Sequence, residues 1–357
     1  ESALQGGFGS ISYDYADNPT FMFQQPHNTI GMQNMQRFME GRRWLHTNLW
    51  TGVHNEDGND RNDAGRQLQG PRFNQSSCFN CHVNNGRSVA PTVRNQRLDT
   101  MAVRVGATGT DANGQYLPHP IYGQALQMNA RSIETGAIQN WGNAAWVSDF
   151  VTSNVSLADG TQVELRKATV AFEGAEPAVY SVRQAQPLIG MGLLEAISDE
   201  TILSRVRTTP DADGVLGTAN YAYDPETGEV RLGRYGWKAG KVSLRHQVTN
   251  AALLDMAVTS SVYPKLACLA GPQQCDPATA EPGLPDEAVT AMTQYLHLLA
   301  VPAQRSVVSG FPKGVSPLTY LDVDPAKIAA GEKVVITLRL ADGRSLPVAF
   351  DVRKTAP

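Results

Sequence analysis

Apolar residues recur at helical spacing in several stretches of the chain. The first stretch begins at Asn28, whose side chain is suited to cap a helix, and continues to about Trp50. Positions three, four or seven residues apart share one face of a helix, so these residues predict a buried stripe. The stripe consists of Ile30, Met35, Phe38, Met39 and Leu45.

Later stretches follow the same pattern. Gln186–Ala196 is apolar, and Ser198 or Asp199 can cap a further helix that ends near Val206. Ser243 can open another helix, and Pro285 begins the most regular one. The expected core positions of these last two helices are Leu244, Val248, Ala251, Ala252 and Met256, then Ala288, Val289, Met292, Tyr295, Leu296 and Leu299.

Strict alternation of apolar and polar residues indicates strands elsewhere. Met101–Val105 alternates, and Thr161–Arg166 alternates after the turn signal Asp159-Gly160. Residues 100–185 therefore predict a β-containing insertion between helical parts. Near the end, Val334–Leu340 and Pro347–Val352 predict a β-hairpin.

Composition narrows the class of protein. The chain has 357 residues, 41% of them hydrophobic and 18% charged, which is typical of a globular protein with a sizeable core. A net charge of −4 does not favour nucleic acid as a partner. The apolar runs are too short to predict a transmembrane segment. No Met precedes Glu1, which we expect to be a processed or trimmed end.

Ser77–His82 contains a C-x-x-C-H motif, formed by Cys78, Cys81 and His82. This spacing is typical of covalent haem attachment, in which two thiols form thioethers with the haem vinyl groups and the adjacent imidazole binds the iron. The motif therefore predicts one covalently bound haem c. Asn84, Asn85 and Gly86 follow, and such residues can end a short helix with a positive φ.

A zinc site and a redox dithiol are the alternatives. Structural zinc needs four ligands, but the remaining cysteines, Cys268 and Cys275, are far away in the sequence. A redox dithiol is expected in a βαβ pattern, which does not surround this motif. Cys268 and Cys275 would close a short loop as a disulfide, the alternative being two free thiols. A disulfide and an attached haem both indicate a periplasmic or extracellular bacterial protein.

Stretches on both sides of the haem motif resemble the bacterial di-haem oxidoreductase family, also called predicted thiol oxidoreductases. This family is distantly related to the di-haem cytochrome c peroxidases. The similar stretches occur in family order from about residue 65 to 305. They are Gly70–Asn74, His119–Gly123 with Gln127, Ala158–Gly160, Leu165-Arg166, Gly190–Ile197, Asp213–Gly217, Gly233–Ala239, Asp255-Met256, Thr259-Ser260, the Cys268/Cys275 pair and the helix ending at Tyr295-Leu296.

The resemblance implies a second C-x-x-C-H motif after the last of these helices. Ile328–Lys333 is similar to the approach to such a motif, but the sequence then continues with β-like alternation. Residues 1–357 contain one C-x-x-C-H motif. Two explanations stay open: a branch of the family with one haem, or a chain in which a segment is missing or rearranged.

The residue on the far side of the iron decides the function, because a six-coordinate haem transfers electrons and an open one can react with peroxide. The resemblance makes Met256 the first candidate for this ligand, with a core methionine as the alternative. His246 is the second candidate. His27, His46 and His54 precede the motif and are further candidates, with an ordinary surface or hydrogen-bonded role as the alternative.

Other side chains are candidates for roles around the haem. Trp237 can relay electrons or serve as a core anchor, and we assign it the catalytic role. Arg234, with Lys238, can neutralise the haem propionates or lie on the surface. Asp211 and Asp213 flank an acidic turn that can contribute oxygen ligands to Ca²⁺, although position twelve of such a loop is Ala222 where an EF-hand requires Glu.

These observations predict a mainly α protein with a cytochrome c-like haem core, β-hairpin insertions and a small C-terminal β segment. We expect an N-terminal arm and helix (1–64), a haem domain (65–310) with the insertion at about 100–185, and a linker with a hairpin (311–357). The expected function is electron transfer or peroxidase-like oxidation with a redox partner protein or a small-molecule oxidant. The alternative is a haem-containing structural or sensing subunit of a larger complex.

Overall fold

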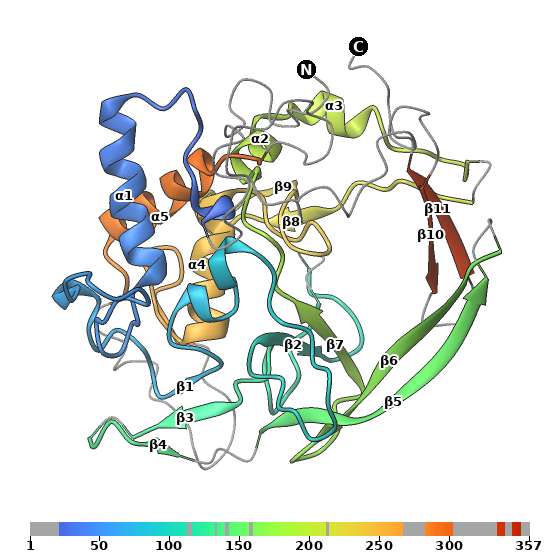
Figure 1. Cartoon of the computed structure of the whole chain (residues 1–357), viewed down its shortest axis with the longest axis horizontal. Helices are drawn as coiled ribbons and strands as arrows, with labels where there is room; N and C mark the ends of the chain where they lie inside the picture. Colours follow the sequence, from blue (N-terminus) through green and yellow to red (C-terminus); the bar gives the residue numbers. More distant parts are fainter. Residues whose placement is uncertain are drawn as a thin grey trace, which may run out of the picture.

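A computed structural model shows the fold in Figure 1. It describes residues 21–112, 116–132, 134–139, 143–156, 160–211, 214–266 and 283–302, together with the backbone of strands 334–339 and 345–350. Residues 1–20 of the predicted N-terminal arm and residues 311–333 of the predicted linker lie outside the described residues. None of the described helices has the length and apolar character needed to cross a membrane.

The helices lie mainly on one side of the molecule and the long β-ribbons on the other (Figure 1). The described α-helices are α1 Met32–His46, α2 Met191–Ala196, α3 Asp199–Leu203, α4 Leu244–Met256 and α5 Asp286–Leu298. Four single-turn 3-10 helices are described, which are η3 Met22–Gln24, η4 Asp63–Gly65, η5 Cys78–Asn80 and η6 Val83–Asn85.

The described strands form small antiparallel sheets. β1 (Arg72–Phe73), β3 (Asn129–Arg131) and β4 (Ile138–Gln139) make one of three strands. The others are two-stranded: β2 (Met101–Gly106) with β7 (Val179–Gln184), β5 (Ala145–Ser156) with β6 (Gln162–Phe172), β8 (Tyr221–Tyr223) with β9 (Val230–Leu232), and β10 (Val334–Arg339) with β11 (Ser345–Phe350).

The prediction of a mainly α fold was wrong. Strands contain at least as many of the described residues as α-helices do. The sequence pattern located β2 and part of β6, but it gave no sign of the eleven- and twelve-residue lengths of β6 and β5. Beyond Val147, the residues of β5 are exposed or only partly buried. The alternation of apolar and polar residues that marks a strand with one buried face is therefore weak there.

Helices α1, α4 and α5 were correctly located, and their ends follow local chemistry. The predicted Ser243 cap is confirmed, because its Oγ accepts a hydrogen bond from the His246 N–H at 3.1 Å. Helix α1 instead begins after Gly31, three residues later than the Asn28 cap would place it. Of the predicted α1 stripe, Phe38 and Leu45 are buried, but Met39 is 51% exposed.

Helices α1 and α5 pack closely because α1 carries glycine at the crossing. A Cβ at Gly41 would lie 2.0 Å from the Ala291 carbonyl oxygen of α5, so a side chain there would force the helices apart. Phe38 packs on Tyr295 beside this contact, with ring centroids 4.7 Å apart. This helical pair supports the segment that carries the C-x-x-C-H motif.

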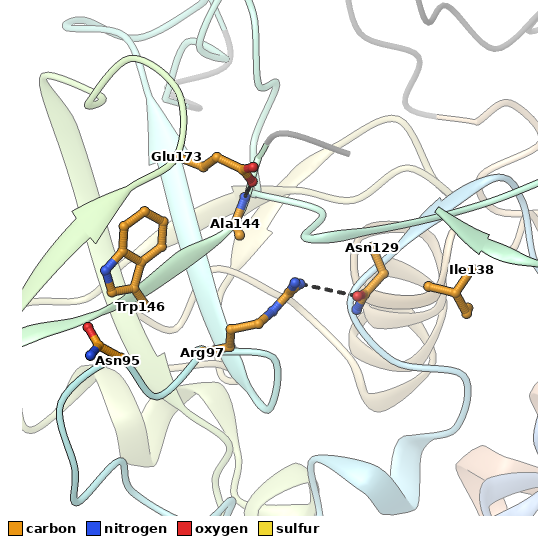
Figure 2. A pocket seen from close by; sticks show the side chains of 7 residues that line it. All are labelled: Asn95, Arg97, Asn129, Ile138, Ala144, Trp146 and Glu173. Carbon is orange, nitrogen blue, oxygen red and sulfur yellow. Dashed lines mark hydrogen bonds between the residues drawn. The ribbon is translucent and has the colours of Figure 1, made fainter. Parts of the chain in front are cut away.

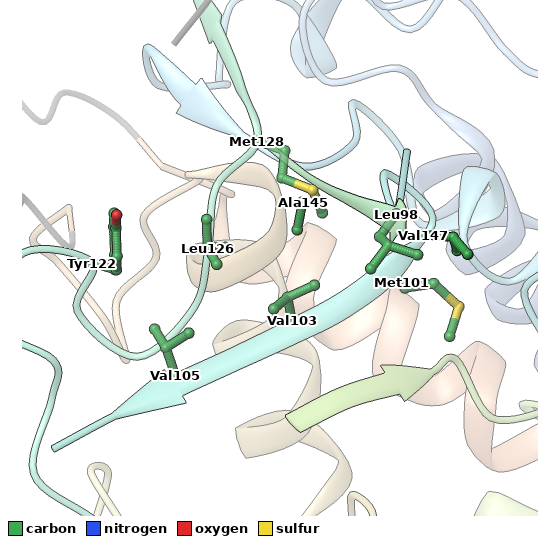
Figure 3. Close-up of a cluster of buried hydrophobic side chains, with 9 residues drawn as sticks. All are labelled: Leu98, Met101, Val103, Val105, Tyr122, Leu126, Met128, Ala145 and Val147. Carbon is green, nitrogen blue, oxygen red and sulfur yellow. The ribbon is translucent and has the colours of Figure 1, made fainter. Parts of the chain in front are cut away.

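A second core lies beneath the β-ribbons (Figure 3). Met101, Val103 and Val105 alternate along β2 and point into it, as the period of two requires. They meet residues from the loop before β3 and from the start of β5. The buried members of this cluster are Leu98, Met101, Val103, Val105, Tyr122, Leu126, Met128, Ala145 and Val147.

Two strand valines test this burial directly. Val103 is fully buried, whereas Val151 is 57% exposed on β5. We expect Val103→Ala to lower the free energy of unfolding by about 2 kcal/mol, because it removes buried methyl groups and leaves a cavity. Val151→Ala should lower it by less than about 0.5 kcal/mol. Denaturant titrations of both variants would measure this, and equal losses would contradict the assigned core.

Candidate haem-attachment site

The C-x-x-C-H motif folds as one tight turn. Cys78 begins η5, and its carbonyl oxygen accepts hydrogen bonds from the N–H groups of Cys81 (3.2 Å) and His82 (2.9 Å). Both cysteines are half-buried free thiols. The turn therefore presents two thiols and an imidazole from five consecutive residues, as attachment of a planar macrocycle requires.

The end of the turn depends on residues that tolerate a left-handed backbone. Asn84 and Asn85 have φ values of 52° and 59°, which confirms the predicted helix end. The Asn85 side chain is fully buried and donates to the Phe23 carbonyl and to the Tyr295 hydroxyl of α5. Asn85 thus ties the exit of the motif to the α1–α5 pair.

The thiols are poorly suited to dithiol redox chemistry. Burial, with the nearby negative charge of Asp255, raises the pKa of Cys78 and of Cys81 to about 12. A reactive dithiol needs a thiol whose pKa is lowered instead, because the thiolate is the nucleophile. The site is also poorly suited to zinc. In the described part of the chain, no cluster of side chains close enough to bind one metal ion includes either cysteine.

His82 has the environment of a metal-binding imidazole. Burial lowers its pKa, which keeps the ring neutral. Its Nδ1 lies 2.8 Å from the carbonyl oxygen of Gln186, and the tautomer that donates there carries its lone pair on Nε2. Metal-bound histidines commonly donate their other ring N–H to a carbonyl or carboxylate in this way. The residues present therefore fit a c-type haem.

The segment that supplies Gln186 continues from β7 and lies along the motif. The Ala185 N–H donates to Ser88 Oγ at 3.0 Å, and the Leu188 N–H donates to the Asn85 carbonyl at 2.8 Å. The Gln184 side chain donates to the Ser88 carbonyl. We call residues 184–188 the strap. The sequence contained no signal for it, because its contacts join positions about one hundred residues apart.

Trp237 lies against the strap on the outer surface. Its indole N–H donates to the Gln184 carbonyl at 2.8 Å, and the side chain is 51% exposed. Trp237 is thus half-exposed rather than a fully buried core anchor, and one residue of the strap, Ala185, separates its contact from the carbonyl that binds His82. Its catalytic role stays a prediction, and its side chain lies at the surface beside the strap.

Arg234 is engaged by protein groups. Its guanidinium donates to the Leu194 carbonyl at 3.1 Å, and it also bonds the Ile197 carbonyl and the Asp199 carboxylate. These contacts join the end of α2 to the start of α3. Lys238 places its ammonium 5.0 Å from the Tyr116 ring. A role for either residue at the haem propionates stays a prediction.

Met256 lies in an apolar cluster rather than on an open face. It is 4% exposed among residues of α4, α5 and the segment before the motif, and Cys78 packs at the edge of the same cluster. The negative charge of the neighbouring Asp255 helps to raise the pKa of both cysteine thiols. Met256 is therefore close to the motif, and its role as sixth ligand stays a prediction.

The other histidine candidates have local partners. His246 is buried and its Nε2 lies 2.9 Å from the Tyr263 hydroxyl, while His27 Nε2 lies 3.2 Å from the Leu299 carbonyl. His46 is fully buried and stacks on His54, with ring centroids 5.1 Å apart. His46 also contacts the ring of Phe79, which lies between the two cysteines.

His46, His54 and Glu56 come close enough to suggest a second metal site. The two imidazoles are stacked, so their in-plane lone pairs point along nearly parallel planes rather than to one point. Arg42 already binds both Glu56 oxygens, at 2.5 and 2.6 Å. The arrangement is therefore a poor metal site as it stands.

The proposed calcium turn and disulfide fall partly or wholly outside the described residues. Asp213, Cys268 and Cys275 are among the residues that the structure does not describe. Asp211 bonds Arg207 at 2.6 Å and accepts from the Val215 N–H at 2.8 Å. These contacts give its carboxylate a turn-forming role, and nothing here supports Ca²⁺.

An open hollow of about 620 Å³ lies near the β1–β3–β4 sheet, and no residue of the motif lines it (Figure 2). Arg97 crosses it and donates to the Met128 carbonyl at 2.8 Å and to Asn129 Oδ1 at 3.2 Å. Glu173 accepts from the Ala144 N–H. Arg97 and Glu173 are thus engaged by neighbouring protein groups, and the hollow brings together none of the candidate site residues.

Comparison with known proteins decides the family. A family model described as "Di-haem oxidoreductase, putative peroxidase" matches residues 3–310. The chain belongs to this family. Membership implies a haem cofactor, an oxidoreductase function of peroxidase-like type, and a redox partner or oxidant. No curated protein and no solved structure matched the chain.

The buried His46 predicts an acid-sensitive fold. Burial, with the positive charge of Arg42, lowers its pKa from 6.5 to about 3. Below about pH 6.5, His46 therefore binds a proton in the unfolded chain but stays neutral in the folded chain. Its contribution to stability is complete above pH 6.5 and is lost as the pH falls towards 3.

We expect His46→Phe to reduce the slope of unfolding free energy against pH between about 6.5 and 4.5. His246, whose pKa is lowered to about 4 by burial, should maintain part of the slope. Denaturant titrations across this range would measure it. Equal slopes for both proteins would show that His46 does not titrate on unfolding.

Proposed function

We propose that this chain is an extracytoplasmic c-type cytochrome of the di-haem oxidoreductase family that carries one covalent haem within residues 1–357. Cys78 and Cys81 would supply the thioether bonds and His82 the proximal iron ligand. When bound, the haem supplies a one-electron redox centre whose iron can also react with a peroxide. The hydrogen bond between His82 Nδ1 and the Gln186 carbonyl is the observation that carries the proposal.

Each residue of the motif has a distinct task in this function. The two cysteines would hold the macrocycle through their thioether bonds. The strap orients the His82 ring, and a carbonyl partner for Nδ1–H makes Nε2 a better electron donor. The half-buried residues Leu188 of the strap and Met191 of α2 pack against the same apolar cluster as Cys78.

Trp237 offers a route between this centre and the surface. Its exposed indole contacts the strap at Gln184, and the strap contacts His82 at Gln186. Two hydrogen bonds and a short length of backbone thus connect solvent to the proximal ligand. We assign Trp237 to exchange of electrons with a redox partner or a small-molecule donor.

Extracytoplasmic location follows from the proposed chemistry. Covalent haem attachment to C-x-x-C-H and a Cys268–Cys275 disulfide are both expected in an oxidising compartment. Fractionation of the native host, with the chain found outside the cytoplasm, is the expected result. Recovery of haem-loaded chain from the cytoplasm would contradict this part of the proposal.

Haem attachment is tested by replacing the motif thiols. Purified wild-type chain should show one haem by pyridine haemochrome assay and one haem's added mass after denaturation. Cys78→Ser and Cys81→Ser should each lose one thioether, and the double variant should lose covalent haem altogether. Cys268→Ser is the matched cysteine control and should keep its haem. Wild-type chain without covalent haem, when made with a cytochrome c maturation system, would refute the proposal.

Trp237 is tested by the rate of electron exchange. We expect Trp237→Leu to slow reduction of the haem by an external donor several-fold while leaving its absorption spectrum unchanged. Tyr221→Leu is the control, because Tyr221 is also 51% exposed and does not contact the strap. Stopped-flow absorption would measure both rates. Equal rates for the two variants would exclude Trp237 as the route.

A further inference from the structure

The β2–β7 ribbon has two faces of different character. Its core face carries Met101, Val103 and Val105 of β2, with Val182 packed against the same cluster. On the opposite face, Arg104 of β2 lies across from Ser181, and Arg183 of β7 lies across from Ala102. This face therefore carries two cations. Arg104 and Arg183 are therefore diagonal neighbours on one face of the ribbon. Strand β7, which contributes Arg183 to this face, continues into the strap.

One carboxylate meets this pair of arginines. Asp255, near the end of α4, binds Arg104 through Nη2–Oδ2 at 2.9 Å, and both side chains are about four-fifths buried. Asp255 also accepts a long bond of 3.5 Å from the Asn74 amide. Asp255 therefore holds Arg104 in place between the ribbon and the helix.

Lys241 adds a third cation. It lies in the segment just before α4, in the same loop as Trp237, where its backbone carbonyl accepts from Arg234 and Tyr235. Its side chain is half-buried. The Trp237 indole of this loop bonds the carbonyl of Gln184, the residue next to Arg183, so the loop packs on the end of β7 that carries the arginine. Burial and the positive charges of Arg104 and Arg183 lower the pKa of Lys241 to about 8.

These cations lack sufficient counter-charge. Within the part of the chain that the structure describes, Asp255 is the one carboxylate that pairs with any of them, which leaves three positive charges against one negative. Arg104 Nη1 is buried without a hydrogen-bond partner. Arg183 makes one long side-chain bond, from Nε to Ser181 Oγ at 3.4 Å. Desolvated cations without partners are unfavourable, so the cluster is suited to a ligand with two negative charges.

The cluster lies beside the C-x-x-C-H motif. The backbone carbonyl of Asp255 accepts from the N–H groups of Asn74 (2.8 Å) and Gln75 (3.2 Å), which lie just before Cys78, and the Asp255 carboxylate binds Arg104. Arg183 is three residues from Gln186, whose carbonyl binds His82. A haem held at this motif carries two propionate groups, which supply two negative charges at one edge of the macrocycle.

We propose that Arg104, Arg183 and Lys241 bind the two propionates of the haem, with Asp255 positioning Arg104. This inference rests on the proposed attachment of haem at the motif, and it assigns the propionates to residues other than Arg234. Arginine binds carboxylates through paired N–H groups, and lysine adds a point charge. Two propionates would bring the net charge of the cluster from +2 to zero.

The test uses the haem-loaded chain and its reduction potential. Arg183→Gln and Lys241→Gln each remove a positive charge near the haem, which favours the ferric state. We expect each to lower the midpoint potential, and the double variant to lower it further. Arg166→Gln and Lys167→Gln remove equal charges from the exposed part of β6 and should leave the potential unchanged. If the double variant and the wild type have the same midpoint potential, the inference is overturned.

Infrared spectroscopy distinguishes contact from a distant charge effect. With propionates labelled by ¹³C, the carboxylate stretching bands of wild-type chain should shift in Arg183→Gln and Lys241→Gln, and Arg183→Lys should recover part of the Arg183→Gln shift. A variant that folds by circular dichroism but loads less haem would also support binding. Unshifted bands in both variants would overturn the assignment.

A free dicarboxylate is the competing occupant of the cluster. Succinate added to haem-loaded wild-type chain should leave the potential and bands unchanged if the propionates fill the site. A succinate response that disappears in Lys241→Gln would overturn the haem assignment. Wild-type chain without covalent haem would refute the proposed function itself, whereas a haem-loaded chain with insensitive variants would refute only the propionate contacts.

Discussion

The hydrogen bond from His82 to the Gln186 carbonyl is the contact on which the candidate site depends. It fixes the orientation of the imidazole and leaves its outer nitrogen available for a metal. The bond exists only because the strap lies along the motif, anchored at Ser88 and Asn85. The strap in turn is placed by β7, which pairs with β2 over a buried core. Correct ligand geometry is therefore a property of the tertiary fold.

The helices support the same motif from its other side. Gly41 permits the close crossing of α1 and α5, and Tyr295 of α5 reaches Asn85 at the exit of the motif. Asp255, at the end of α4, places a negative charge near the cysteines. The motif thus lies where a helical group and a β-ribbon meet, and its residues gain rigidity from both.

The sequence was informative where function or folding depends on adjacent residues. The C-x-x-C-H spacing, the Ser243 cap and the alternation of Met101–Val105 are local signals, and the structure bears out the last two. The strap and the cations at Arg183 and Lys241 could not be inferred, because strand pairing and loop packing bring them to the site from remote positions. The fold class was misjudged because the exposed β5–β6 ribbon has little hydrophobic alternation.

The high pKa of the two cysteine thiols has a consequence for the order of biosynthesis. In the finished fold both thiols are protonated at neutral pH and covered in part by packing. A protonated thiol is a weak nucleophile, so thioether formation would be slow once this fold is complete. The strap that orients His82 lies about one hundred residues after the motif in the sequence. We therefore expect maturation to add the macrocycle to an unfolded chain, and the strap to pack against the motif in a later step.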